Sequence, residues 1–316
     1  MINNLNPNYT IVEETKVEEI NSEAYSLEHN GTGAKILILK NDDDNKTFSI
    51  TFRTTPENST GVAHILEHSV LCGSEKYPVK EPFVEMIKGS LNTFLNAMTY
   101  PDKTMYPVAS RNDKDFKNLM AVYLDAVFFP NIYKDETILM QEGWHYELEN
   151  PEDELKYKGV VYNEMKGVYS SPDSMVYRKI CRGLLPDTIY GVDSGGNPKD
   201  IPNLTQEEFI NFHKKYYHPS NAYIVLYGDI DINERLEFLH NEYLSKFSRK
   251  EIDSKIKMQK PFKEVKELQE YYSISKEDDD KNKSFFTYNF AVSSTADVTK
   301  NLAYEVLEYV LIDAQG

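Results

Sequence analysis

The sequence contains little that would suit an oxidised or membrane-bound protein. Two of its 316 residues are cysteine, so we expect no disulfide framework and infer a reducing compartment. No apolar run approaches the length that spans a bilayer. The first eight residues lack both a basic segment and an apolar core, so neither a signal nor a transit peptide is expected. These absences predict a cytoplasmic protein with no membrane partner.

Basic residues are also in the minority. The chain carries 35 Lys and Arg against 51 Asp and Glu, which leaves a formal net charge of −16. Because nucleic-acid-binding proteins usually carry a basic surface, this balance argues against a nucleic-acid partner. Hydrophobic residues make up 40% of the chain, which is enough for a sizeable core at this length. A globular protein is therefore expected.

The most informative segment is HILEH at residues 64–68. Residues four apart share a helix face, so His64 and His68 can bind one ion while Glu67 reaches a water on it. The H-x-x-E-H order inverts the commoner H-E-x-x-H zinc motif and is the inverzincin pattern. The segment predicts the zinc centre of a hydrolase. The alternative is a pair of surface histidines on an amphipathic helix.

A catalytic zinc usually takes three protein ligands, and we predict Glu164 as the third. Helical spacing over residues 159–168 places it on one face with Val161 and Met165. A carboxylate in an apolar stripe is costly unless it is paired or bound to metal. The alternative is a partly exposed acid or one paired with a basic neighbour. Weaker candidates, in an expected helix end and charged loop, are Glu142, Glu147 and Glu149.

The two cysteines raise other possibilities. Cys181 as a third ligand would make a two-histidine, one-cysteine site, and an H-x-x-E-H pair with a downstream cysteine resembles ribosylhomocysteine lyase, a much shorter enzyme. Cys181 lacks a metal-facing pattern, and a lone cysteine is more often a small buried residue. Cys72 follows His68 by four residues on the same helix face. It is either a redox-sensitive neighbour of the site or a buried thiol.

Three segments together resemble the pitrilysin (insulinase) metallopeptidases, and in particular the presequence protease branch. They are the HILEH motif, residues 89–104 and residues 159–167. The resemblance covers residues 10–250 and implies a zinc peptidase that digests short, unfolded peptides inside a closed chamber. It implies that Glu164 is the distal zinc ligand, at the longer spacing typical of this branch.

Residues 92–98 are expected to form an extended segment. An exposed sheet edge can accept a peptide as an added strand, because backbone pairing recognises any extended chain. The resemblance implies that Asn96 and Ala97 lie on this edge beside the scissile bond, that Asn96 polarises its carbonyl, and that Met98 belongs to the same substrate-binding edge. The alternative for Asn96 is a turn-capping amide.

Hydrophobic periodicity predicts an α+β fold. Strands are expected over residues 35–39, 47–54 and 222–227. Helices are expected after Gly61 and over residues 81–90, 113–128, 134–144, 156–169, 205–217 and 231–245. This order favours a sheet covered by helices. The resemblance implies that this is a pitrilysin-type domain with a mostly antiparallel sheet. The glycine-rich loop at 191–200 is expected to be a conformational constraint rather than a phosphate-binding loop.

We predict two domains. Residues 1–250 would form the catalytic zinc metallopeptidase domain, the charged residues 251–263 a linker, and residues 264–316 the incomplete start of a second, similar domain. That last part offers two strands, at 264–275 and 284–293, and a helix at 298–313, which is too little for an independent sheet. The resemblance implies a clamshell of four such domains, with the remaining C-terminal domains as partners. A natural short protein whose last helix docks on the first domain is the alternative.

The sequence therefore predicts a zinc-dependent endopeptidase that acts on short unfolded peptides, with one Zn²⁺ per chain. His64, His68 and Glu164 would hold the ion, and Glu67 would take a proton from the attacking water and pass it to the leaving amine. The chain by itself would cleave weakly or not at all, since the family implies further groups in the second half of the enzyme. The alternative is a non-catalytic peptide-binding or assembly module of the same fold.

Overall fold

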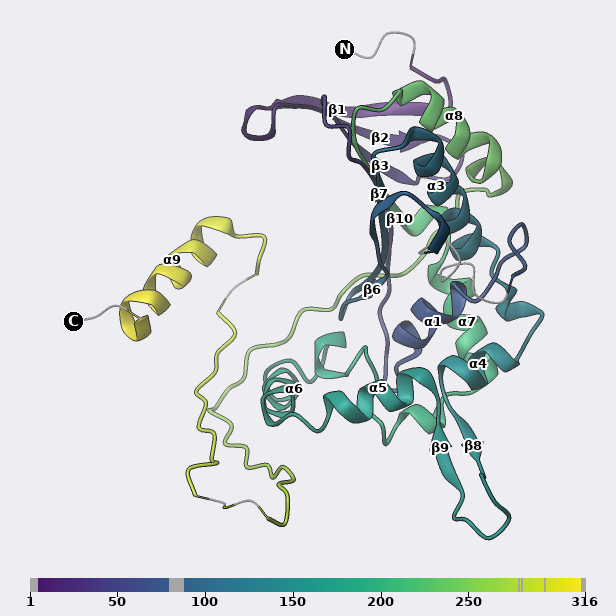
Figure 1. Cartoon of the computed structure of the whole chain (residues 1–316). Coiled ribbons are helices and arrows are strands. Elements are labelled where there is room, and N and C mark those ends of the chain that lie inside the picture. Colours follow the sequence, from purple (N-terminus) through teal and green to yellow (C-terminus); the bar gives the residue numbers. More distant parts are fainter. Residues whose placement is uncertain (1–4, 80–87, 278, 280, 293, 314–316) are drawn as a thin grey trace.

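The computed structural model describes residues 5–79, 88–277, 279, 281–292 and 294–313. Its main element is an eight-stranded sheet in the order β1-β2-β3-β10-β4-β7-β5, with β6 also paired to β7 (Figure 1). All neighbouring pairs are antiparallel except β10 and β3. The strands are β1 (Tyr9–Val17), β2 (Ser22–His29), β3 (Lys35–Lys40), β4 (Lys46–Arg53), β5 (Asn92–Leu95), β6 (Met98–Thr99), β7 (Lys103–Ser110) and β10 (Ala222–Gly228).

Helices cover one face of this sheet, and a separate hairpin of β8 (His145–Glu147) and β9 (Lys156–Lys158) projects from the domain (Figure 1). Among the described residues, no helix is both long and apolar enough to cross a membrane. The helices are α1 (Val62–Val70), α3 (Asp113–Phe128), α4 (Thr137–Glu142), α5 (Val160–Val168), α6 (Pro172–Leu184), α7 (Gln206–Tyr216), α8 (Ile232–Glu242) and α9 (Val298–Glu308).

A continuous row of apolar side chains crosses five strands of the sheet. The register pairs Leu27 with Ile36, Ile36 with Ile224, Ile224 with Ile50, and Ile50 with Tyr106. All five side chains are buried, because alternate residues of a strand point to the same face and this face lies under the helices. Each buried aliphatic side chain contributes roughly 1.5–3 kcal/mol to folding.

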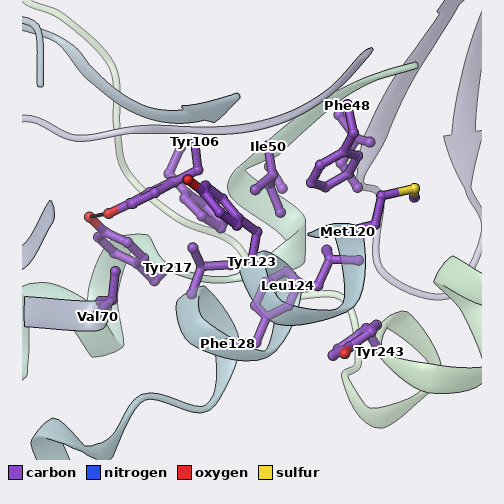
Figure 2. Packing of buried hydrophobic residues seen from close by; sticks show 14 of the residues in the cluster. Phe48, Ile50, Val70, Tyr106, Met120, Tyr123, Leu124, Phe128, Tyr217 and Tyr243 are labelled. Atoms are coloured by element: carbon purple, nitrogen blue, oxygen red, sulfur yellow. Dashed lines mark hydrogen bonds between the residues drawn. The ribbon is translucent and has the colours of Figure 1, made fainter. Parts of the chain in front are cut away.

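Aromatic residues fill the space between the sheet and the helices. In Figure 2, Tyr106, Tyr123 and Tyr217 lie together, and a hydrogen bond of 2.8 Å joins the hydroxyls of Tyr106 and Tyr217. The paired hydroxyls satisfy each other, as buried tyrosines require. Burial raises the pKa of all three phenols, and the charge of Glu67 raises it further. The tyrosines therefore form a neutral layer beneath Glu67.

The predicted α+β fold with a mostly antiparallel sheet is confirmed. The helix expected over 113–128 is α3, and those expected over 205–217 and 231–245 are α7 and α8. The helix expected over 134–144 is the shorter α4, and the one expected over 81–90 falls largely outside the described residues.

The helix expected over 156–169 is wrong at its start. Residues 156–158 form β9, and the helix begins only after Gly159. This glycine has a φ of 155°, and a Cβ there would lie 2.1 Å from the carbonyl oxygen of Gly143. The close backbone contact ends the hairpin and separates it from α5, which no periodicity in the sequence reveals.

The strands expected over 264–275 and 284–293 are also wrong. The described residues of 251–297 form neither helix nor strand, and most of their large apolar side chains are exposed, as at Tyr271 and Phe286. A strand needs a neighbour for its backbone hydrogen bonds, and the described residues supply none here. The expected helix is present as α9 with a π-helical turn at Tyr309–Asp313, and none of the α9 residues is buried. The two-domain division stays a prediction.

The first turn of α1 lies in close backbone contact with a distant loop. Gly61, which precedes α1, has a φ of 72°, and a Cβ there would lie 2.9 Å from the Gly195 oxygen and 2.9 Å from the Gly196 Cα. Gly196 also has a positive φ, of 101°. The loop around residues 193–196 therefore packs directly against the start of α1.

Substituting Gly61 with Ala should destabilise the protein, since the new Cβ meets backbone atoms and φ is unfavourable for an L residue. We expect a loss of roughly 1–3 kcal/mol in the free energy of unfolding measured by urea titration. Gly167→Ala in α5 is the matched control, because a Cβ there has nothing within 4 Å. The control should be neutral or slightly stabilising; an equal loss in both variants would contradict the close contact.

A buried histidine makes the core sensitive to acid. His213 in α7 is 3% exposed, and its Nε2 lies 2.9 Å from the carbonyl oxygen of Val127. That oxygen only accepts, so Nε2 carries the proton and Nδ1 accepts from the Tyr133 hydroxyl at 2.7 Å. Burial lowers the pKa of His213 to about 4, so the folded protein keeps this side chain neutral.

The pKa of His213 is lower in the folded protein than its usual 6.5, so the unfolded chain takes up the proton first. The contribution of neutral His213 to the free energy of unfolding is therefore complete above pH 6.5 and is lost as pH falls toward 4. The loss in the free energy of unfolding reaches about 3 kcal/mol near pH 4. His213→Gln can keep one donor and one acceptor without titrating, so the free energy of unfolding should fall less between pH 6.5 and 4. His145→Gln, at a position that is not buried, should leave the pH dependence unchanged. Equal slopes in all three proteins would contradict this assignment.

Candidate metal centre

Helix α1 presents two histidines on the side away from the core. Ile65, Leu66 and Val70 are fully buried against the sheet and neighbouring helices. His64 and His68, one turn apart, are only partly buried, and their ring centroids lie 5.0 Å apart with the planes at 75°. The apolar face of α1 thus anchors the helix and fixes the direction in which the two imidazoles point.

Helix α5 brings a carboxylate to the same place. Glu164 Oε2 lies 3.7 Å from the Nε2 of His64 and 3.8 Å from the Nε2 of His68. One ligand atom from each of the three residues falls within 4.8 Å of the others. Two imidazole nitrogens and a carboxylate oxygen are donors that zinc accepts in three-ligand sites. The donor set therefore fits the ion predicted from the sequence.

Glu164 does not lie within the buried face of α5. The sequence placed it within an apolar stripe of α5, but its side chain is 49% exposed while Val161 and Met165 are buried. On a helix, residue 164 is one position before 165 and lies at the flank of the buried face rather than within it. Its location near the histidines comes from helix packing, since α4 contacts both α1 and α5, and not from a costly buried charge.

Each imidazole has a second partner on its Nδ1 side. His64 Nδ1 lies 3.0 Å from the backbone oxygen of Gly195, which only accepts, so Nδ1 must carry the proton. His68 Nδ1 lies 3.4 Å from Glu142 Oε2. Partners of this kind fix the tautomer of a metal-binding histidine and leave the Nε2 lone pair free. Both Nε2 atoms consequently face Glu164.

Carboxylates dominate the electrostatics of the site. Burial alone would lower the pKa of His68, but Glu142, Glu67 and Glu164 outweigh it and the pKa is raised. Burial would raise the pKa of Glu142, but its bonds to His68, Cys72 and Gln141 outweigh this and lower it. Three acidic groups around two imidazoles create a negative site, which favours a bound cation.

The two histidines, Glu67 and Glu164 line a cavity of about 570 Å³ that also includes the edge of the sheet. The extended segment predicted over 92–98 is present as two short strands, β5 and β6, which pair with β7 and are interrupted at Asn96 and Ala97. The Asn96 side-chain oxygen accepts from the Ala97 backbone at 2.9 Å, a local turn bond. The cavity is lined by His64, Glu67, His68, Asn96, Ala97, Met98, Thr99, Tyr100, Glu164 and Gly195.

The remaining candidates lie outside the three-residue group. Cys181 is on α6, hydrogen-bonded to Tyr177, so a two-histidine, one-cysteine site is not formed within the described residues. Glu147 pairs with Lys158 at 2.6 Å in the hairpin, and Glu149 is exposed in the following loop. The Cys72 thiol lies 3.6 Å from the His68 carbonyl oxygen, half-buried beside the site.

Two contributors were missed in the sequence. Glu142 was weighed only as a ligand, yet it contacts the outer nitrogen of His68 and is 7% exposed. Its spacing from Ile138 and Leu139, both buried, already placed it on the inner face of α4. No comparable signal exists for Gly195, because it contributes a backbone oxygen.

The chain is similar to known peptidases along almost its whole length. Residues 52–167 match the family model "Insulinase (Peptidase family M16)", and residues 203–315 match "Peptidase M16 inactive domain". It is 60% identical over 309 residues to "Protein HypA" of Clostridium perfringens. It is 54% identical over 304 residues to "Presequence protease 1, chloroplastic/mitochondrial" of Arabidopsis thaliana, and 43% identical over 313 residues to "Presequence protease, mitochondrial" of Xenopus laevis.

These matches cover 95–98% of this chain but 28–32% of the relatives, so the chain spans less than a third of their length. Among solved structures, the crystal structure of pitrilysin matches with a TM-score of 0.62 at 19% identity, over 81% of this chain and 26% of that one. This likeness supports the fold alone. From the family models and the relatives together, we conclude that the chain belongs to the insulinase family of peptidases, M16, and is similar to its presequence proteases.

Proposed function

We propose that the chain carries the zinc-binding half of a metalloendopeptidase site. The observation that supports this most directly is the approach of Glu164 Oε2 to the Nε2 atoms of His64 and His68, at 3.7 and 3.8 Å. Glu67 lines the same cavity and is 7% exposed. A set of metal-binding side chains, a carboxylate that can accept a proton and a cavity for a ligand are therefore adjacent.

Glu67 is proposed as the general base and acid. When bound, zinc supplies the Lewis acidity that activates water and polarises a carbonyl at neutral pH. Glu67 then accepts the proton of the attacking water and donates it to the leaving amine. The tyrosines beneath Glu67 stay neutral because burial raises their pKa, so they place no negative charge beside its carboxylate.

The edge of the sheet is proposed to hold the peptide. Within the described residues, β5 has no strand on its outer side, and β6 follows it along β7. An extended peptide can pair with such an edge through its backbone, which would select unfolded substrates. We assign Ala97 and Met98 to this edge. We assign the side-chain NH₂ of Asn96 to the scissile carbonyl, because the side-chain oxygen of Asn96 already accepts from the Ala97 backbone.

The complete enzyme is proposed to contain further domains. The relatives are about three times longer, in line with the C-terminal partner domains expected from the sequence. We retain residues 1–250 as the catalytic domain, 251–263 as the linker and 264–316 as the start of the next domain. The cytoplasmic location stays a prediction, because relatives include chloroplast and mitochondrial proteins.

The ligand assignment predicts about one zinc per chain by elemental analysis. His68→Ala and Glu164→Gln should each weaken zinc affinity more than the roughly 10–100-fold typical of losing an outer partner. Glu149→Gln removes an acid of the same type outside the group and should bind zinc like the parent. Full zinc binding by Glu164→Gln would show that another group is the third ligand.

The general-base assignment predicts that Glu67→Gln keeps its zinc but loses hydrolysis of a fluorogenic unfolded peptide. The expected loss in kcat is roughly 10²–10⁴-fold, since Gln cannot transfer the proton. Both proteins are assayed as this chain and as the chain extended by the C-terminal domains found in the relatives. Undiminished turnover by Glu67→Gln in the extended protein would reject the role.

The non-catalytic alternative makes the opposite prediction in the same assay. A peptide-binding module would bind the peptide equally well after zinc removal and after Glu67→Gln. Neither the parent chain nor its extended form would cleave the peptide. Peptide affinity measured by fluorescence anisotropy, with and without a chelator, therefore separates the two functions.

A further inference from the structure

Asp193 connects several elements around the metal centre. Its carboxylate Oδ1 accepts the Gly195 backbone N–H at 3.0 Å. Its Oδ2 accepts the Tyr169 hydroxyl at 2.7 Å and the Arg178 Nε–H at 2.5 Å. The Asp193 side chain is 15% exposed, so these charge-assisted bonds are largely shielded from water. Both oxygens of one carboxylate are thus occupied by groups from different elements.

The Oδ1 bond fixes the loop that contacts His64. The Asp193 backbone N–H donates to the Ser59 hydroxyl at 3.0 Å, just before α1, and the Gly196 N–H donates to the Asp193 carbonyl at 3.1 Å. Gly195 lies inside this turn, with its carbonyl 3.0 Å from His64 Nδ1. The direction of that carbonyl therefore depends on how Asp193 holds the turn.

The Oδ2 bonds reach the helix that carries Glu164. Tyr169 is the C-cap of α5, five residues beyond Glu164, and its ring also lies 4.8 Å from the guanidinium of Arg178. Arg178 in α6 is itself held by the Ser174 carbonyl at 3.1 Å. Asp193 thereby links the end of α5 to the loop at the start of α1.

We propose that Asp193 is a positioning residue of the metal centre, which sets the His64 tautomer through Gly195 and ties the Glu164 helix to the same loop. Its consequence for zinc binding rests on the proposed function, whereas its effect on His64 can be observed without metal. Asp193 touches neither the proposed ion nor substrate. It acts through its bonds to Gly195, Tyr169 and Arg178.

Replacing Asp193 with asparagine should break part of this set of hydrogen bonds while keeping the shape of the side chain. The Asn oxygen can accept either the Gly195 N–H or the pair from Tyr169 and Arg178, but its NH₂ group cannot accept the others. The charge that balances Arg178 is also lost. We therefore expect the Gly195 carbonyl to lose its fixed direction.

The first test is ¹⁵N NMR of the histidine ring in the metal-free chain. The parent should show His64 protonated on Nδ1, and Asp193→Asn should show a mixture with the Nε2–H tautomer. Zinc affinity, measured by competition with a chromogenic chelator, should weaken roughly 10–100-fold in the variant. The matched control is Asp200→Asn, which removes the same charge from the same loop at a side chain that makes no capping bond.

A double-mutant cycle separates positioning from general loss of stability. Tyr169→Phe removes one hydrogen bond to Asp193. Its effect on zinc affinity should not add to that of Asp193→Asn, because both substitutions break the same set of hydrogen bonds. Thermal unfolding of the metal-free proteins is measured in parallel. A merely structural role would lower the unfolding temperature while leaving the His64 tautomer and zinc affinity of the folded protein unchanged, which would overturn the proposal.

The outcomes also distinguish this proposal from the function on which it rests. If the parent binds no zinc but Asp193→Asn still shifts the His64 tautomer, the positioning role holds and the zinc site is rejected. If the parent binds zinc and Asp193→Asn changes neither tautomer nor affinity, the zinc site holds and the positioning role is rejected.

Discussion

The place of β10 between β3 and β4 is the constraint on which the rest of the domain depends. β10 is far from β3 and β4 in the sequence, yet it pairs with β3 in parallel and with β4 antiparallel. Ile224 completes the apolar row from Leu27 to Tyr106. Because β10 follows α7, its insertion also brings that helix against α1. The arrangement around the site therefore depends on contacts between residues that are far apart in the sequence.

The residues of the candidate metal centre are held to different degrees. Helix α1 is buried on one side and so holds both histidines, whereas Glu164 lies half-exposed on α5 and approaches from the side. Outer contacts then orient the rings, through the backbone oxygen of Gly195 and the carboxylate of Glu142. Side chains on regular elements with such support are held more accurately than those on loops.

The surroundings of the site differ on its two sides. Beneath Glu67 lies a packed, neutral layer of tyrosines, while the cavity side is formed by the interrupted edge at Asn96 and Ala97. Between residues 251 and 297 the described chain forms neither helix nor strand, and α9 lies apart from the sheet in Figure 1. Many apolar side chains are exposed there, and the chain spans less than a third of the length of its relatives.

The sequence by itself determined the local features. The HILEH spacing placed His64, Glu67 and His68 on one short helix, and period-two and helical patterns located β3, β4, β10, α3, α7 and α8. Tertiary structure decided what depends on distant contacts: the break at Gly159, the lack of strands among the described residues after 263, the exposure of Glu164, and the contacts of Gly195 and Glu142. The physical reason is that side-chain periodicity reports which face of an element is buried, whereas backbone contacts and missing strand partners leave no periodic signal.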